Sequence, residues 1–459
     1  MKRASVATFS DIPSKKAGNL IDADVLNLPL PTVVEHSILE QGKIYFTPIG
    51  GITVPRTESE GALSLDEIIG DVRPISSLHL TYHLDFHYLY SCYPTEHRNY
   101  PMKLVVGAKD AVDLENATRD HKNVTVVGVP LESFGTHHTK MSMYESADGR
   151  VHVIVSSANL TTDDWEFKTQ QFYYAVGYKR ASEKETTRSP FQSDLIEYLG
   201  EYRYALQEWR ELVSRTDFTE VVDRLVYSAP GKHKAVAAQR IGHPRLQMLL
   251  SQLFPAKKSN QSTEPCTYVT QCSSLGSLGV VANQWFTGEF LRSLEGANPA
   301  PKTNPPKLWL IFPCVEDIRR SCRGYISGAS VPYKMRIHSK QTWLRHYLCK
   351  WRANKRRRTI AVPHCKTYGK FENQIPKWQL LTSANLSKAA WGEMKKGGVL
   401  HIRSYEMGVL ITDPNRFNFP FDYPLSKYTD SDQPFTCDKN HHNPDIFGQV
   451  YTPPSTSMF

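Results

Sequence analysis

Short apolar runs alternate with amphipathic segments along most of the chain. Residues 102–109 (MKLVVGAK) and 124–130 (VTVVGVP) are rich in β-branched side chains and end in turn residues, which is typical of buried strands. Residues 78–93 (LHLTYHLDFHYLYSCY) are apolar and aromatic and open this pattern, and residues 150–160 (RVHVIVSSANL) predict a further strand. Strands that alternate with helices indicate an α/β protein with largely buried sheets.

The strongest helical pattern covers residues 190–213. Its apolar side chains recur at helical spacing, so we predict one amphipathic helix whose aromatic residues belong to the core. These side chains are Leu195, Leu199, Tyr202, Leu206 and Trp209. In the second half of the chain, residues 308–314, 378–386 and 406–412 predict strands, and residues 294–307, rich in proline and glycine, predict a surface loop.

A decapeptide frame occurs twice, as SSANLTTDDW at 156–165 and as TSANLSKAAW at 382–391, with five identical positions out of ten. An H-x-K motif precedes each copy, and 21 positions separate the histidine from the asparagine in both. The paired residues are His138 and His364, Lys140 and Lys366, and Asn159 and Asn385, each pair 226 positions apart. A repeat at one long offset indicates a duplicated domain, because arrays of small units recur every ~20–50 residues.

The repeat therefore sets the expected domain organisation. We predict a loosely ordered leader over residues 1–35, an N-terminal domain over 36–228 and a C-terminal domain over 229–459, with the crossover near 227–234. Each domain is within the usual size range of a domain with a single hydrophobic core. We expect an α/β fold of two similar α/β/α sandwich domains related by a pseudo-twofold axis.

Composition and charge narrow the class of protein. No run of 18 or more apolar residues occurs, the N-terminus lacks a secretory signal, and the eight cysteines include no C-x-x-C pair. We therefore expect a reduced intracellular protein without a membrane span. The net charge is +9, and residues 345–358 hold seven Lys or Arg and no acid. This segment predicts a polyanion-binding surface or a nuclear localisation signal, with an ordinary solvated loop as the alternative.

Each His-Lys-Asn set can supply half of a phosphoryl-transfer site. Two lysines and two asparagines can surround the non-bridging oxygens of one phosphate. Two histidines on opposite sides suit an in-line displacement, in which one attacks as neutral imidazole and the other protonates the leaving oxygen. From the residues alone the two histidines are interchangeable. We expect the site at the interface between the two domains.

We predict no metal and no cofactor. Each motif histidine has a lysine two positions away, which would repel a divalent cation. Cys437 with His441 and His442 is a far weaker zinc candidate. Trp165 and Trp391, which also repeat, are predicted to be packing residues of the helices that follow the asparagines.

The motifs resemble the phospholipase D superfamily, whose paired H-x-K motifs form one site, and more narrowly the eukaryotic type of tyrosyl-DNA phosphodiesterase. FGTHHTKM, SSANLTTDDWEFKTQ, SSLGSLG, PHCKTY, TSANLSKAAWG and IRSYEMGVL are similar to that family in order, over residues 75–425. The general superfamily pattern has Asp five positions after Lys. Here Glu145 and Phe371 stand there, which favours the narrower family.

The resemblance implies roles for individual residues. His138 would be the nucleophile that forms a phosphohistidine with the DNA 3′ end, and His364 would be the general acid and then the general base. Lys140, Lys366, Asn159 and Asn385 would bind the phosphate, and Gln170 and Glu406 would orient the two histidines. On the DNA side, Phe134 would stack on a base. Ser274, Ser277 and Ser387 would contact the backbone, and Tyr82 would line the pocket.

The function implied is DNA repair by hydrolysis of the bond between a topoisomerase I-derived tyrosine, or another 3′ adduct, and the DNA 3′-phosphate. The partners implied are DNA with a blocked 3′ end, single-stranded or frayed there, and a topoisomerase I-derived peptide. We expect a nuclear monomer that acts without a membrane and tolerates EDTA. Two alternatives stay open: a lipid-acting phospholipase D-type phosphodiesterase, and a catalytically silent DNA-end-binding protein.

Overall fold

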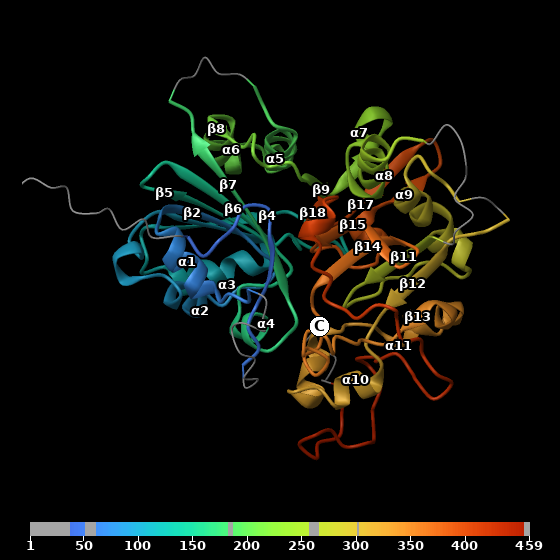
Figure 1. Cartoon of the computed structure of the whole chain (residues 1–459). Helices are drawn as coiled ribbons and strands as arrows, with labels where there is room; N and C mark the ends of the chain where they lie inside the picture. The colour runs from blue at the N-terminus through green and yellow to red at the C-terminus, as the bar shows by residue number, and fades with distance from the viewer. Residues whose placement is uncertain (1–36, 51–60, 182–186, 257–265, 301–302, 454–459) are drawn as a thin grey trace, which may run out of the picture. The chain divides into compact units, whose positions relative to one another are not determined.

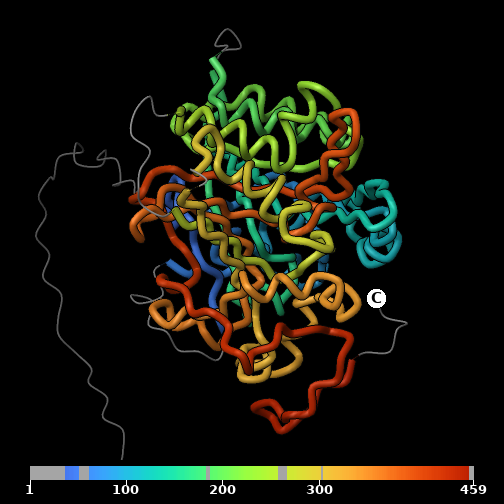
Figure 2. The backbone as a smooth tube through the Cα atoms, turned by 90° about the vertical axis from the view of Figure 1, so that its right-hand side faces the viewer, coloured from blue at the N-terminus to red at the C-terminus, as the bar shows by residue number. Residues whose placement is uncertain are grey.

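The computed structural model describes residues 37–50, 61–181, 187–256, 266–300 and 303–453. The predicted leader, residues 1–35, lies outside the described residues. The described residues from Ile38 onward belong to one compact unit, in which the first half of the chain and the second half lie side by side (Figure 1). Seen from the right-hand side of that view, the second half, in yellow and orange, stands in front of the first (Figure 2).

The first half of the described chain forms an eight-stranded mixed sheet. Its order is β1 (Ile44–Phe46), β7 (Gln171–Lys179), β6 (Arg150–Ser156), β5 (Met141–Ser146), β2 (Pro74–Leu80), β3 (Met102–Gly107) and β4 (Val124–Val129), and β8 (Thr216–Asp217) pairs with β7. β2, β3 and β4 run parallel, whereas β2, β5, β6 and β7 pair antiparallel.

The second half forms a seven-stranded sheet of matching topology. Its order is β13 (Leu348–Cys349), β12 (Lys307–Ile311), β11 (Cys266–Gln271), β14 (Lys366–Glu372), β15 (Ile375–Thr382), β18 (Glu406–Ile411) and β9 (Arg224–Ser228). Strand for strand, β13-β12-β11-β14-β15-β18 repeats β4-β3-β2-β5-β6-β7, including which pairs are parallel. The predicted pair of similar α/β domains is confirmed. β9 pairs with β18, so residues 224–228 belong to the second sheet.

The second copy carries a hairpin that the first lacks. Asn159 and Gln170 are 11 positions apart, whereas Asn385 and Glu406 are 21 apart, a difference of 10. The extra residues form β16 (Glu393–Lys395) and β17 (Val399–Ile402), which join β10 (Gly231–His233) in a small sheet of order β10-β17-β16. The insertion follows the repeated frame, which ends at Trp391, so it leaves the His-Lys-Asn spacing unchanged.

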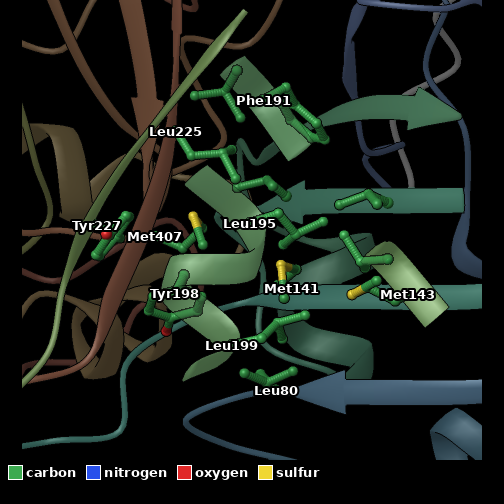
Figure 3. Packing of buried hydrophobic residues seen from close by; sticks show 14 of the residues in the cluster. Leu80, Met141, Met143, Phe191, Leu195, Tyr198, Leu199, Leu225, Tyr227 and Met407 are labelled. Atoms are coloured by element: carbon green, nitrogen blue, oxygen red, sulfur yellow. The ribbon is translucent and has the colours of Figure 1, made fainter. Parts of the chain in front are cut away.

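Helices cover both faces of the first sheet. One face packs on α1 (Leu65–Val72), α2 (Phe86–Ser91), α3 (Ala108–Thr118) and α4 (Thr162–Glu166). The other face packs on α5 (Pro190–Gly200) and α6 (Gln207–Ser214). Side chains of α5 such as Phe191 and Leu195 meet Met141 of the first sheet and Leu225 and Met407 of the second (Figure 3). One apolar core therefore spans both sheets and ties the two halves together.

The second sheet has its own core. The helices on this half are α7 (Ala235–Gln239), α8 (Gly242–Leu253), α9 (Leu291–Glu295), α10 (Val315–Arg319), α11 (Met335–His338) and α12 (Lys388–Trp391). Trp391 and, in the first half, Trp165 are almost fully buried, so their prediction as packing residues is confirmed. None of the helices in the described part of the chain is both long and apolar enough to span a membrane.

The prediction of one continuous helix over residues 190–213 is wrong, because the structure has two helices there. α5 ends at Gly200, Arg203 has φ 53°, and a 3-10 turn (Arg203–Leu206) leads into α6. Left-handed backbone cannot continue an α-helix, so the two pieces change direction there. Leu195, Leu199, Tyr202, Leu206 and Trp209 are nevertheless all buried, as their spacing predicted.

The basic segment 345–358 is folded into the second half. Its cations make contacts within the chain, among them Arg345 with the carbonyls of Thr429, Asp430 and Asp432, Lys350 with Asp432, Arg352 with Asp317, and Arg358 with the carbonyl of Thr47. Arg358 is buried and does not belong to an exposed polyanion-binding surface, whereas for the rest of the segment that expectation stays a prediction. Lys355 and Arg357 are exposed.

Buried histidines predict that acid destabilises the fold. Burial lowers the pKa of His79 and His364 to about 3 and of His137 and His152 to about 4. The unfolded chain therefore binds more protons than the native one once the pH falls below about 6.5. We expect the free energy of unfolding, measured by urea titration, to fall steadily from about pH 6.5 to pH 4. Constant stability over this range would contradict the buried neutral state of these rings.

Candidate active site

Each H-x-K segment pairs with a segment from the other half of the chain. The His138 N–H donates to the Tyr405 carbonyl, and the Tyr405 N–H donates to the Thr136 carbonyl, each at 3.0 Å. On the other side, the His364 N–H donates to the Thr169 carbonyl at 3.0 Å. β5 begins directly after the first segment, and β14 begins at Lys366, the last residue of the second. The backbone thus places both histidines at the interface between the two sheets.

The side chains that contact the two imidazoles also cross this interface. His138 Nδ1 lies 3.0 Å from Glu406 Oε2, and His364 Nδ1 lies 2.7 Å from Gln170 Nε2. Glu406 and Gln170 stand directly after the paired segments described above, at the beginning of β18 and just before β7. A partner at Nδ1 fixes the ring and leaves Nε2 free. The structure therefore brings all four residues together as two crossed pairs.

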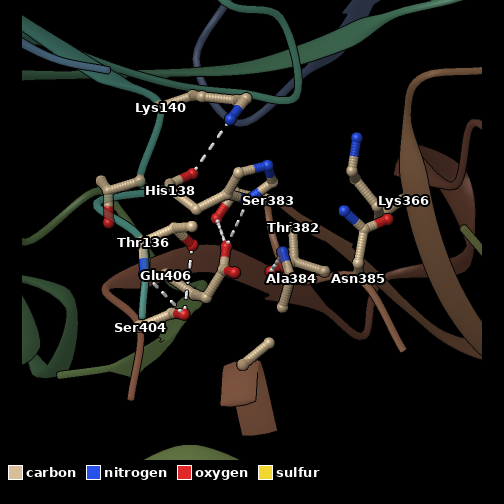
Figure 4. Close-up of polar contacts among 12 residues, drawn as sticks. Thr136, His138, Lys140, Lys366, Thr382, Ser383, Ala384, Asn385, Ser404 and Glu406 are labelled. Atoms are coloured by element: carbon tan, nitrogen blue, oxygen red, sulfur yellow. Dashed lines mark hydrogen bonds and ion pairs between the residues drawn. The ribbon is translucent and has the colours of Figure 1, made fainter. Parts of the chain in front are cut away.

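Two serines that we did not predict hold these partners in place. Ser383 Oγ donates to Glu406 Oε2 at 2.5 Å (Figure 4). Ser157 Oγ lies 2.7 Å from Gln170 Oε1. Both serines are fully buried. They stand in the repeated frame, two positions before each asparagine and 226 positions apart, so their identity in both copies was a usable signal.

The two lysines occupy equivalent places. Lys140 Nζ donates to the His138 carbonyl at 3.1 Å, and Lys366 Nζ donates to the His364 carbonyl. Burial lowers the pKa of Lys140 to about 7, helped by the charge of Lys366, and burial lowers the pKa of Lys366 to about 8. Two cations this close and this well buried favour an anion between them.

The two asparagines differ in their contacts. Asn385 Oδ1 accepts from the N–H groups of Ser273 and Ser274 at 3.2 and 3.0 Å, which turns its amide nitrogen to the site (Figure 4). Asn159 is buried, and within the described chain its Oδ1 has no hydrogen-bond partner. An amide held at one end can present its donors to a phosphate oxygen without reorganisation.

Aromatic residues lie on the first-half side of the site. The Tyr82 ring is 5.3 Å from the His138 ring, and Lys140 Nζ lies 5.6 Å from the Tyr82 ring centre. Phe134 is 83% exposed with φ 65°, a left-handed conformation that is unfavourable for a bulky residue. The following Gly135 allows this turn to approach the other half, because a Cβ there would lie 2.2 Å from the Arg403 carbonyl oxygen. An exposed, strained aromatic side chain is a feature of ligand contacts.

The three predicted serines are placed differently from one another. Ser274 lies beside Asn385 through its backbone N–H. Ser387 caps α12, its Oγ accepting from the Ala390 N–H at 3.1 Å. Gly276 lets the Ser274 loop reach this cap, since a Cβ there would lie 2.7 Å from Ser387 Cβ. Ser277 is exposed on the same loop.

The two histidines lie beside different charged side chains. Burial lowers the pKa of His138 against the opposing charge of Glu406, and burial lowers the pKa of His364 to about 3 against Asp164. The Glu406 carboxyl is penalised by burial, but the charge and hydrogen bond of His138 hold its pKa below the usual value. Both rings are neutral in the free protein near pH 7, so one can attack at once and the other needs a bound anion to become protonated.

The polar tail that contains Cys437 is packed against the second half. His441 stacks on Phe435 with ring centroids 5.0 Å apart, and Cys437 is buried in the second core. Within residues 37–50, 61–181, 187–256, 266–300 and 303–453, no three His, Cys, Asp or Glu side chains group in a way that could hold a metal ion.

The lysine pKa values predict an alkaline limit on substrate capture. As the pH rises through about 7 to 8, Lys140 and Lys366 lose protons in the free protein and with them the charges that attract phosphate. We expect kcat/KM to fall across this range, while kcat at saturation holds to higher pH because the bound anion raises both pKa values. Initial rates from about pH 6 to pH 9 measure both. A flat kcat/KM would contradict this role.

Two domains of one topology, with an H-x-K histidine from each meeting at their interface, define a protein of the phospholipase D-like fold class. The comparisons with known proteins narrow this class. The family model of tyrosyl-DNA phosphodiesterase matches residues 43–446. The chain therefore belongs to the tyrosyl-DNA phosphodiesterase family of hydrolases.

Relatives agree with this assignment. A probable tyrosyl-DNA phosphodiesterase of Caenorhabditis elegans is 58% identical, covering 91% of this chain and 94% of the relative. Tyrosyl-DNA phosphodiesterase 1 of Drosophila melanogaster is 32% identical, covering 93% and 80%. The crystal structure of the yeast tyrosyl-DNA phosphodiesterase is similar in fold, with a TM-score of 0.69 at 21% identity over 86% of this chain and all of that one.

Proposed function

We propose that this protein hydrolyses the phosphodiester bond between a tyrosine and the 3′ end of DNA, and so removes topoisomerase I-derived peptides or other 3′ adducts. The observation that carries the proposal is the pair of imidazoles held at Nδ1 across the interface, with two buried lysines beside them. This arrangement supplies a nucleophile, a proton donor and two positive charges for one phosphorus centre.

In the first step, Nε2 of neutral His138 attacks phosphorus, and the bond from phosphorus to the tyrosine oxygen breaks. His364, protonated at Nε2, gives its proton to that oxygen, so tyrosine leaves as a neutral phenol. In the second step, His364 takes a proton from water, and the oxygen attacks the phosphohistidine. The DNA keeps a 3′-phosphate, and His138 returns as neutral imidazole.

Lys140, Lys366, Asn159 and Asn385 stabilise the charge on the non-bridging oxygens in both steps. No metal enters this mechanism, because the lysines supply the positive charge that a cation would otherwise provide. The exposed Phe134 would stack on a base near the DNA end, a contact worth about 1–3 kcal/mol in other proteins. Ser274, Ser277 and Ser387 would contact the DNA backbone from the neighbouring loops.

Two observations favour DNA repair over the alternatives. Cleavage of a lipid would not require an exposed aromatic residue such as Phe134 for stacking on a base. The family assignment points to tyrosyl-DNA linkages. A silent DNA-end-binding protein would not need the serine-anchored partners at both Nδ1 atoms. One chain supplies both halves of the site, so a monomer suffices. A nuclear location follows from the substrate and remains a prediction.

The test uses an oligonucleotide that carries a 3′-phosphotyrosine, incubated with the protein in EDTA. We expect release of tyrosine and a 3′-phosphate end, and no turnover of phosphatidylcholine vesicles. An intact oligonucleotide with vesicle turnover would assign the lipid activity instead. Tight binding of the oligonucleotide without cleavage would assign the binding-only function, and loss of activity in EDTA would overturn the metal-free mechanism.

A further inference from the structure

The two halves of the site are not equivalent, and the difference lies at Asp164. This residue is in α4, five positions after Asn159. The corresponding position in the second copy, 226 further on, is Ala390. Asp164 therefore has no counterpart in the second copy, and the carboxylate beside His138 is Glu406, which stands at the position that Gln170 has in the first copy.

Asp164 lies against His364 and is itself held on three sides. Its Oδ2 is 3.1 Å from His364 Nδ1 and accepts from the Asn159 N–H at 2.7 Å. Its Oδ1 accepts from Lys168 Nζ at 2.6 Å. Asp164 and Lys168 are 2% and 5% exposed, and Lys168 also contacts Asp163. A buried carboxylate with this many donors is a fixed negative charge.

The carboxylate settles which nitrogen of His364 carries the proton. Ionised Asp164 can only accept, so His364 Nδ1 must carry a hydrogen to bond with it. Gln170 then has to present its oxygen to the same nitrogen. A half-turn of its amide does this and lets Nε2 donate to Ser157 Oγ, while that hydroxyl donates to the Gln171 carbonyl, which lies 3.1 Å away. Every polar group in this set then has a partner.

Charge completes the difference between the two histidines. Burial penalises the Asp164 carboxylate, but His364 and Lys168 hold its pKa well below the usual range. Three charged groups act on His364: Asp164 raises its pKa, whereas Lys366 and Lys168 lower it. Lys168 thereby limits how strongly Asp164 stabilises the imidazolium, so that the proton can still be given away. At His138, Glu406 raises the pKa and Lys140 and Lys366 lower it, but Glu406 contacts Ser383 and forms no ion pair with a lysine of the described chain.

We propose that Asp164, balanced by Lys168, is the positioning residue that holds His364 in the tautomer and orientation that proton transfer needs. The inference rests on the proposed function. Asp164 keeps Nδ1 protonated and orients the ring, so Nε2 gives its proton to the leaving oxygen and later takes one from water. No proton passes to Asp164 itself. Orientation by a buried carboxylate is how acid–base histidines are held in hydrolases.

The test is Asp164→Asn on two oligonucleotides, one with a 3′-phosphotyrosine and one with a 3′-(4-nitrophenyl) phosphate. Tyrosine needs a proton to leave, whereas 4-nitrophenol is acidic enough to leave without one. We expect the single-turnover rate of bond breaking to fall on the order of 100-fold with the tyrosyl substrate and by less than about 5-fold with the nitrophenyl substrate. The covalent DNA–protein adduct should then accumulate, because its hydrolysis also needs His364.

Asp163→Asn is the matched control, since Asp163 contacts the same Lys168 Nζ but not His364. It should leave both substrates near the wild-type rate. If Asp164→Asn lowers the rate of bond breaking equally on both substrates, its role is structural and the proposal is overturned. An unchanged rate on both substrates would also overturn it. If the wild type cleaves neither substrate, the proposed function itself has failed.

A second variant keeps the proposal testable if Asp164→Asn does not fold. Lys168→Met leaves Asp164 in place but removes the cation that offsets it, so the pKa of His364 should rise. We expect the alkaline limb of the single-turnover pH profile with the tyrosyl substrate to move to higher pH, on the order of one unit. An unmoved limb in a folded variant would overturn the proposal.

Discussion

Replacing His138 by alanine is expected to abolish cleavage of a 3′-phosphotyrosyl oligonucleotide, with a loss of at least about 10⁴-fold in the single-turnover rate. The loss is this large because the attacking atom itself is removed. Lys140, Lys366 and the asparagines can still bind the phosphate, so the affinity for the oligonucleotide should change far less than the rate. Quench-flow measurement of tyrosine release and a filter-binding titration report the two quantities separately.

His442→Ala is a suitable control, because it removes an exposed imidazole of the C-terminal tail and leaves the site intact. A His138→Ala protein that still releases tyrosine within a factor of ten of wild type would show that His138 is not the nucleophile. Activity restored by added imidazole, with no adduct on the protein, would support the assignment, since a free ring can occupy the space that the side chain leaves.

Replacing His364 by alanine should slow tyrosine release by about 10²–10⁴-fold, because the leaving oxygen then departs without a proton. The second step should suffer as much, since no group remains to activate water. The expected signature is a covalent DNA–protein band that survives denaturation and persists for hours. Gel electrophoresis with an end-labelled oligonucleotide detects it.

The double variant with both histidines changed to alanine separates the two roles. We expect it to give no band, because the nucleophile is absent. A band that appears with His138→Ala and disappears with His364→Ala would exchange the assignments. It would also remove the role that we propose for Asp164 beside His364. With a 4-nitrophenyl leaving group, His364→Ala should still form the adduct quickly, which links this prediction to the one made for Asp164.

The residues that repeat along the chain were predictable, because duplication leaves a fixed offset. The six His, Lys and Asn residues each recur 226 positions apart, and the two sheets that carry them have the same strand order. Strands such as residues 102–107 and 406–411 were also predictable, since both faces of these sheets are buried and their sequences are correspondingly apolar. Local patterns and internal symmetry were enough for this part.

Local patterns could not predict the break in the helix after Gly200. The apolar spacing continues through it, and only packing against two sheets at once makes the turn at Arg203 favourable. The internal contacts of the basic segment could not be predicted for a similar reason. Its composition is that of a polyanion-binding surface, but Arg352 and Lys350 pair with Asp317 and Asp432, which are distant in sequence.

The sequence by itself determined that the site is built twice and which side chains each copy contributes. Only the tertiary structure decided that the copies differ, because Asp164 has no counterpart at Ala390 and meets His364 across 200 residues of chain. A repeat shows only what the two halves have in common, so a residue that is present in one copy alone leaves no repeated signal. Such a contact exists only once folding has brought the two sheets together, and there the burial of charge makes it strong.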